Sequence, residues 1–166
     1  MLAIRQATQS DATAMLLVHR EAVFSKAAAR YAQATLSAWA SGPTPDRVAR
    51  VELRIADPGS IVLVAEAGDD IVGYIVATPA ESELRAVYVK PNSIGHVGRA
   101  LLAEAERRAR KAGTEYLNCN ASLNAVEFYK ANGYSEEGRG KHRLGTGDPM
   151  DCVFMRKKLD PPAPAQ

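Results

Sequence analysis

The sequence predicts a domain in which a mixed β-sheet is flanked by helices, and three observations support this fold class. The 166 residues suffice for one well-filled core and are too few for two ordinary domains. Strand-like runs follow one another in the middle of the chain, whereas strand-like and helix-like segments alternate in the second half. The strand–loop–helix–strand order over residues 82–119 further predicts a parallel crossover connection.

The N-terminal third is predicted to hold one strand and three helices. Residues 2–8 alternate enough for a short strand, and Ser10 or Asp11 then caps the helix that follows. A second helical piece over residues 29–40 ends at a Ser-Gly-Pro break. Residues 46–57 carry apolar side chains at helical spacing and end at a Pro-Gly pair, which predicts a third helix.

The middle of the chain carries the clearest strand signals. Residues 60–78 contain two β-branched runs around Ala-Gly-Asp-Asp, which is the pattern of a hairpin. A third strand is predicted over residues 81–89, bounded by Pro91. Apolar residues on one side of 98–111, with Gly113 directly behind them, predict a helix with a glycine C-cap.

The C-terminal part is predicted to contain a strand, a helix and a final strand. The first strand covers residues 114–121, the helix covers 122–134, and the last strand covers 151–159. We expect residues 138–149 to form a strand end and a mobile loop.

Composition and charge exclude several classes of protein. Apolar residues make up 46% and charged residues 24%, as in soluble globular proteins. A net charge of +2 is too small to favour nucleic acid as the main partner. No apolar run approaches the ~20 residues of a membrane span, and the N-terminus does not read as a signal peptide. We therefore expect a cytoplasmic protein with one domain over residues 1–159 and a disordered tail over 160–166.

Neither the cysteines nor the histidines form a pattern that points to a metal. Cys119 and Cys152 are too few for a disulfide framework or a metal cluster, and both are expected as buried, reduced thiols. His19, His96 and His142 show no ligand spacing with one another or with the cysteines, so no metal site is expected.

A short glycine loop precedes the helix predicted over residues 98–111. Gly95 and Gly98 lie where a helix N-terminus would offer unpaired N–H groups and a positive dipole end to an anion. Arg99 would add a positive charge in the first turn. A plain tight turn into a helix explains the same residues equally well. The loop lacks the Gly-Lys-Ser/Thr of a Walker motif and the three spaced glycines of a dinucleotide fingerprint.

Two linked motifs make the interpretation of this loop more specific. The block ELRAVYVKPNSIGHVGRALLAEAERRARKAG, followed by LNCNASLNAVEFYKANGY, resembles the GNAT superfamily of acyl-CoA-dependent N-acetyltransferases. The first block is similar to the family's acyl-CoA motif, and the second to its Asn-x-x-Ala-x-x-Phe-Tyr-x-x-x-Gly-Tyr/Phe motif. The resemblance implies a central mixed, mostly antiparallel sheet of about six to seven strands with helices on both faces.

The loop departs from the family's usual Arg/Gln-x-x-Gly-x-Gly/Ala pattern. Aligned on Gly98, the chain has His96 at the first glycine and Ser93 at the Arg/Gln. Alternatively, one residue of a longer loop is deleted. In either alignment, backbone N–H groups are expected to form the pyrophosphate cradle. The residues expected to contact the pyrophosphate are Ile94, Gly95, His96, Val97, Gly98 and Arg99.

The resemblance also assigns the strand before the loop to the pantetheine arm of the coenzyme. The backbones of Val87 and Val89 are expected to hydrogen-bond that arm, and an N–H group near Val87 to polarise the thioester carbonyl. The alternative, that both valines are core residues, is compatible because only their backbones are required.

Two residues are candidates for acid–base catalysis. By resemblance, Tyr129 protonates the thiolate that leaves the thioester; alternatively, its ring packs in the core and its hydroxyl bonds locally. Glu83 is the candidate base that accepts the proton of the attacking ammonium, directly or through water. A solvated carboxylate at the strand edge is the alternative for Glu83, and Glu81 is a rival.

The remaining candidates lie around these groups. Asn124 is matched to the motif's asparagine, which contacts the pantetheine arm in relatives, with helix capping as the alternative. Lys130 is a candidate for the nucleotide phosphates, with a solvated surface position as the alternative. Acceptor recognition is expected from helices 11–56 and the loop 138–150, where Trp39 is a candidate pocket or core residue.

The sequence therefore predicts an N-acetyltransferase that moves the acetyl group of acetyl-CoA to a primary amine by direct attack, without a metal. The acceptor is a small-molecule or peptide amine, and neither nucleic acid nor a membrane is an expected partner. The alternative is a catalytically weak CoA-binding sensor or partner-binding module, favoured only by the altered loop. A homodimer is expected somewhat more than a monomer.

Overall fold

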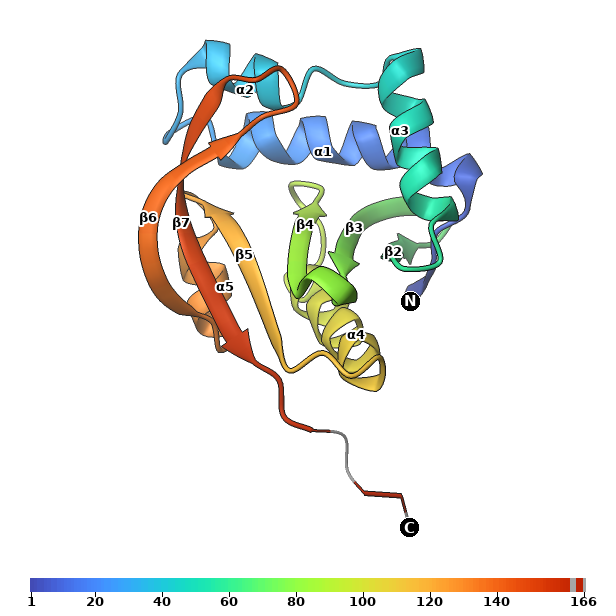
Figure 1. The fold of residues 1–166 in the computed structure, drawn as a ribbon. Helices are drawn as coiled ribbons and strands as arrows, with labels where there is room; N and C mark the ends of the chain where they lie inside the picture. Colours follow the sequence, from blue (N-terminus) through green and yellow to red (C-terminus); the bar gives the residue numbers. More distant parts are fainter. Residues whose placement is uncertain (162–163, 166) are drawn as a thin grey trace.

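The structure is a computed structural model that describes residues 1–161 together with 164 and 165 (Figure 1). Within these residues, seven strands form one sheet in the order β1-β2-β3-β4-β5-β7-β6. All neighbouring strands are antiparallel except β4 and β5, which are parallel. The strands are β1 (Leu2–Gln6), β2 (Ile61–Ala67), β3 (Asp70–Thr78), β4 (Glu83–Val89), β5 (Tyr116–Ser122), β6 (Ser135–Arg143) and β7 (Pro149–Lys158).

Helices cover both faces of this sheet (Figure 1). The first three, which precede β2, gather on one side, and the last two lie on the other. The helices are α1 (Ala12–Lys26), α2 (Gln33–Trp39), α3 (Pro45–Ala56), α4 (Val97–Lys111) and α5 (Val126–Ala131). Single 3-10 turns lie at Gln9–Asp11 and Pro79–Glu81. The predicted fold class, a mixed sheet flanked by helices, is confirmed.

The core continues on both sides of the central strands. On β2, Val62 and Val64 pack in the cluster beneath α1, whereas Leu63 and Ala65 pack in the cluster beneath α4. All four side chains are fully buried. A strand covered on both faces carries a continuous apolar run instead of alternation, which explains the Ile-Val-Leu-Val-Ala segment.

The sheet is split between β4 and β5. The two parallel strands share a single register pair, Glu83 with Asn118, beside which the Asn118 N–H donates to the Ser82 carbonyl at 2.8 Å. Beyond this pair the strands diverge (Figure 1). The edge of β4 that faces β5 therefore has no strand partner over most of its length, which exposes its backbone groups to the gap.

Two C-terminal predictions differ from the structure in extent. Residues 138–149 were expected to be a strand end plus a loop, and the strand is longer than that, because Ser135–Arg143 form β6, a nine-residue edge strand paired with β7. Most side chains of β6 are exposed, so it lacks the hydrophobic alternation by which a strand is recognised. The helix expected over 122–134 is limited to Val126–Ala131, because Ser122 still belongs to β5. The predicted tail, 160–166, lies partly outside the described residues.

Candidate active site

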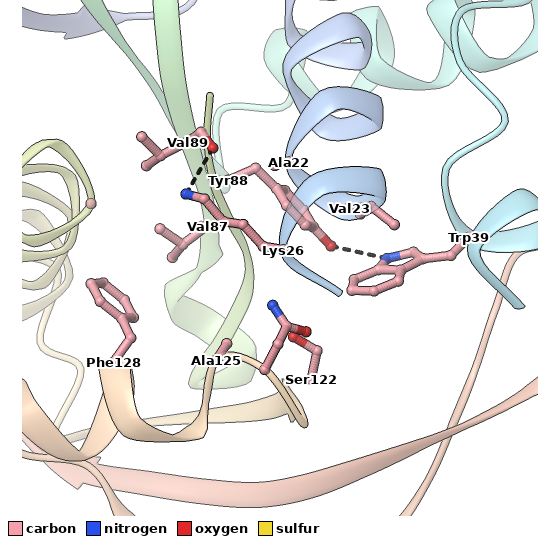
Figure 2. Close-up of a pocket in the computed structure, with 12 residues that line it drawn as sticks. Ala22, Val23, Lys26, Trp39, Val87, Tyr88, Val89, Ser122, Ala125 and Phe128 are labelled. Atoms are coloured by element: carbon pink, nitrogen blue, oxygen red, sulfur yellow. Dashed lines mark hydrogen bonds between the residues drawn. The ribbon is translucent and has the colours of Figure 1, made fainter. Parts of the chain in front are cut away.

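A cavity of about 380 Å³ opens where β4 and β5 diverge (Figure 2). The end of α1 and Trp39 of α2 form one wall, and Val87, Tyr88 and Val89 form the β4 side. The start of α4 and the segment from β5 to α5 complete the lining. The residues on that side are Gly98, Ser122, Asn124, Ala125 and Phe128. The cavity thus collects residues from six elements, α1, α2, β4, α4, β5 and α5, around the unpaired edge of β4.

The backbone of β4 offers hydrogen-bonding groups to this cavity. The Lys90 N–H donates to the Val72 carbonyl on the β3 side at 2.8 Å. Because backbone groups alternate in direction along a strand, Val89 and Val87 turn theirs to the opposite side, toward β5. The Lys26 ammonium donates to the Val89 carbonyl at 3.1 Å, in agreement with this direction. The two valines predicted to bind a pantetheine arm are therefore brought to the cavity with their backbones facing it.

The glycine loop places its two glycines in different surroundings. The helix α4 begins at Val97, whose side chain is buried in the core. At Gly98 a Cβ atom would lie 3.2 Å from the Phe128 ring and 3.5 Å from the Val89 side chain. At Gly95 it would meet nothing within 4 Å. A side chain at position 98 would thus press against Phe128, whereas position 95 has room for a side chain.

Three side chains of the loop predicted for the phosphates lie on the surface. The apolar Ile94 and the polar His96 and Arg99 are all exposed around the start of α4. Arg99 has no ion-pair partner among the described residues, so its guanidinium is available to an anion. Lys130 instead lies within 4.0 Å of two carboxylates, Glu127 at 3.8 Å and Glu136 at 3.9 Å, and does not line the cavity.

Tyr129 lies behind the cavity wall. Its ring is 7% exposed and packs edge-on against Phe128 and Tyr134, at centroid distances of 5.3 and 5.4 Å. Burial raises the pKa of Tyr129 well above its ordinary value, so the phenol stays protonated at neutral pH. Its hydroxyl has no hydrogen-bond partner among the described residues. The arrangement keeps a phenolic proton next to Phe128, which lines the cavity.

Glu83 stands at the closed end of the split, where β4 still pairs with β5. Its carboxylate forms an ion pair with Arg85 at 3.1 Å, and Arg85 also contacts Glu81 at 2.5 Å. Glu83 does not line the cavity, so a proton would have to reach it through water.

Asn124 and Ser122 both line the cavity. The Asn124 side-chain oxygen is buried without a hydrogen-bond partner among the described residues. When the Asn-x-x-Ala-x-x-Phe-Tyr motif is aligned on Ala125 and Phe128, its asparagine falls on Ser122. Either side chain can therefore supply a polar contact to a ligand in the split.

An aromatic cluster supports the wall opposite α4. The Trp39 indole N–H donates to the Tyr88 hydroxyl at 3.0 Å (Figure 2), and the His19 ring packs against Tyr88 at a tilt of 53°, with ring centroids 4.4 Å apart. Burial and the neighbouring Arg47 lower the pKa of His19 to about 3, which keeps this imidazole neutral. Tyr31 extends the wall, because its hydroxyl donates to the Asp151 carbonyl at 2.6 Å and accepts from the Leu123 N–H at 2.8 Å.

The comparisons with known proteins agree with this geometry. Residues 25–158 match the family model of the acetyltransferase (GNAT) domain. The chain belongs to the GNAT acetyltransferase family. No curated protein sequence matches the chain significantly.

Solved structures with the GNAT fold superimpose on nearly the whole chain. The GCN5-related N-acetyltransferase (aminotransferase, class II) from Rhodopseudomonas palustris is 27% identical, with a TM-score of 0.84 and 95% of each chain covered. The ribosomal-protein-alanine N-acetyltransferase from Brucella melitensis is 30% identical, with a TM-score of 0.69 and coverage of 95% of this chain and 99% of that one. The PaiA N-acetyltransferase from Thermoplasma acidophilum, solved with coenzyme A, is 22% identical, with a TM-score of 0.74 and coverage of 95% and 99%.

Several cavity residues of this GNAT protein are absent from the sequence predictions, among them Ser122, Lys26 and Tyr88. Ser122 could have been found by counting the motif back from Ala125. Lys26 gives no such signal, because only the packing of α1 against β4 brings it to Val89. Among residues 1–161, 164 and 165, no group of three or more potential metal ligands occurs, and no helix is long and apolar enough to cross a membrane.

Proposed function

We propose that the protein transfers the acetyl group of acetyl-CoA to a primary amine by direct nucleophilic attack. The observation that carries the proposal is the unpaired edge of β4 beside a cavity at the β4–β5 split. A pantetheine arm laid along this edge would take the place of a neighbouring strand and satisfy backbone groups that lack one.

The coenzyme is assigned to the residues that border the split. Val87 and Val89 bond the pantetheine arm, and the Val87 N–H polarises the thioester carbonyl. Asn124 adds a side-chain contact to the arm. The pyrophosphate lies against residues 94–99, where α4 begins and Arg99 has no ion-pair partner in the described part of the chain. Lys130 reaches the nucleotide phosphates only by leaving its two carboxylate neighbours.

The reaction then needs one proton donor and one proton acceptor. The neutral amine attacks the thioester carbonyl, the C–S bond breaks, and Tyr129 protonates the departing thiolate. The proton that the nitrogen loses as the amide forms restores the Tyr129 phenol. Glu83 accepts the proton of the substrate ammonium through water. A covalent route through Cys119 is disfavoured, because burial and the neighbouring Cys152 raise the pKa of its thiol to about 12 and a protonated thiol is a poor nucleophile.

The acceptor amine approaches from the side of α1 and α2. Trp39 and Tyr88 line this side of the cavity and hold each other through the indole–hydroxyl bond. Aromatic faces of this kind attract an ammonium group and tolerate apolar substrate carbon.

A screen of small-molecule and peptide amines for CoA release tests the proposal. Acetyl-CoA should raise the melting temperature, since a ligand that binds only the folded state stabilises it. A suitable amine should then release free CoA thiol together with an equal amount of acetylated amine. Binding of acetyl-CoA without release of CoA in the presence of any amine would favour the sensor alternative. Absence of acetyl-CoA binding would refute both the acetyltransferase and the sensor hypothesis.

A further inference from the structure

One amine of the protein already lies in the cavity proposed for the thioester. Lys26, the last residue of α1, lines the cavity and brings its ammonium to 3.1 Å from the Val89 carbonyl (Figure 2). It is the only lysine or arginine among the residues that line this cavity. Its side chain therefore crosses from α1 to the edge of β4 along which the coenzyme arm is proposed to run.

The ammonium of Lys26 has no opposite charge to hold its proton. Among the described residues, no carboxylate lies within the 4.0 Å of an ion pair. Partial burial lowers the pKa of Lys26 from its ordinary value. A lysine in such surroundings supplies more of the neutral, nucleophilic amine at neutral pH than a solvated lysine does.

The reacting position is within reach of this side chain. Val87, proposed to face the thioester carbonyl, lies two residues before Val89, which is about 6.6 Å along a strand. The lysine stem has four methylene groups and swings freely. When the coenzyme arm takes over the Val89 carbonyl, the displaced amine stays in the same cavity and is free to turn toward the acetyl group.

We propose that Lys26 is acetylated by the acetyl-CoA bound to its own chain. The inference rests on the function proposed above. The neutral Nζ attacks the thioester carbonyl, an amide N–C bond forms and the C–S bond breaks. The lysine nitrogen loses two protons on the way from ammonium to amide, of which one goes to water. The thiolate takes a proton from Tyr129, and the other nitrogen proton restores the Tyr129 phenol. The products are Nε-acetyl-Lys26, CoA and one proton, so that atoms and charge balance.

The modification changes the cavity. An acetylated Lys26 has lost its positive charge and keeps one N–H for the Val89 carbonyl, while its acetyl group occupies part of the space beside β4. The coenzyme arm must then compete with a bulkier side chain. The fully acetylated protein is therefore expected to bind acetyl-CoA more weakly than the unmodified protein.

Mass spectrometry of the full chain incubated with acetyl-CoA, without added amine, tests the inference. Intact mass should rise by one acetyl group, and peptide mapping should locate it at Lys26. Labelling of Lys26 should be at least ~10-fold faster than that of Lys111, because a bound donor raises the effective concentration. The rate should not depend on protein concentration, and excess CoA should suppress it.

Variants separate enzymatic labelling from reaction with free acetyl-CoA. Lys26→Arg should lose the rapid label, whereas Lys111→Arg should retain it. Labelling of Lys26 that is no faster than that of Lys111, or that is unaffected by excess CoA, would overturn the inference. If external amines are acetylated while Lys26 stays unmodified, the inference fails and the proposed function stands. If acetyl-CoA does not raise the melting temperature, both fail.

Discussion

Replacement of Tyr129 by phenylalanine removes the proposed acid and leaves the rest of the site in place. The ring keeps its edge-on contacts with Phe128 and Tyr134, because only the hydroxyl is lost. That hydroxyl has no hydrogen-bond partner among the described residues, so its removal breaks no bond. We expect the free energy of unfolding to change by less than about 1 kcal/mol.

The catalytic effect should be much larger than the effect on stability. A positioned general acid contributes roughly 10²–10⁴-fold to a rate. The leaving group here is a thiolate, which is only weakly basic because the parent thiol has a pKa of about 8.5. We therefore expect Tyr129→Phe to lower kcat by about 10²-fold, the lower end of that range, which is about 2.7 kcal/mol of transition-state stabilisation.

Steady-state kinetics of CoA release, with calorimetry of acetyl-CoA binding, measures this difference. Tyr134→Phe is the matched control, because the Tyr134 hydroxyl donates to the buried Glu106 carboxylate at 3.1 Å. The control should lose about 1–3 kcal/mol of stability with kcat unchanged. An unchanged kcat in Tyr129→Phe, with the protein folded and acetyl-CoA bound, would refute the acid role.

Three further predictions concern other parts of the site. Glu83→Gln should lower kcat/KM roughly 10- to 100-fold if Glu83 is the base, whereas Glu81→Gln should leave it unchanged; the reverse result would assign the base to Glu81. Gly98→Val should weaken acetyl-CoA binding at least ~10-fold by crowding the edge of the cavity, whereas Gly95→Ala should leave the stability of the free protein unchanged. Equal effects of the two substitutions, on binding in calorimetry and on stability in thermal melts, would contradict this distinction. Buried His19 stays neutral down to about pH 3, while an unfolded histidine protonates near 6.5, so the free energy of unfolding should fall by roughly 2 kcal/mol between about pH 7 and 5. Urea titrations should show that the stability of His19→Gln depends less on pH over this range. The same pH dependence in both proteins would disprove a buried, neutral His19.

The sequence predicted the elements whose side chains carry a hydrophobic period. The buried run of β2 and the amphipathic α4 were both found, and α4 differs from its predicted start at Gly98 by one residue. The full extent of the edge strand β6 was not predicted, because its pairing with β7 depends on backbone hydrogen bonds, which leave no hydrophobic pattern in an exposed strand.

The candidate site was predictable only where a local motif encodes it. The glycine loop and Tyr129 belong to such motifs, and the unusual Val97 of the loop is explained by its burial in the core. The place of Lys26 depends on tertiary packing, since Lys26 and Val89 are 63 residues apart along the chain. The split of the sheet likewise depends on how far β4 and β5 pair. The order of the elements indicates that these two strands are parallel neighbours, but not where their pairing stops.

A crystal structure of the protein with acetyl-CoA tests the central claim most directly. We predict that the pantetheine arm lies along β4 in the split, with the acetyl carbonyl at the Val87 N–H and the pyrophosphate against residues 94–99. The Lys26 ammonium should have left the Val89 carbonyl. Acetyl-CoA bound elsewhere on the protein, with Lys26 still on Val89 and the split empty, would contradict the account.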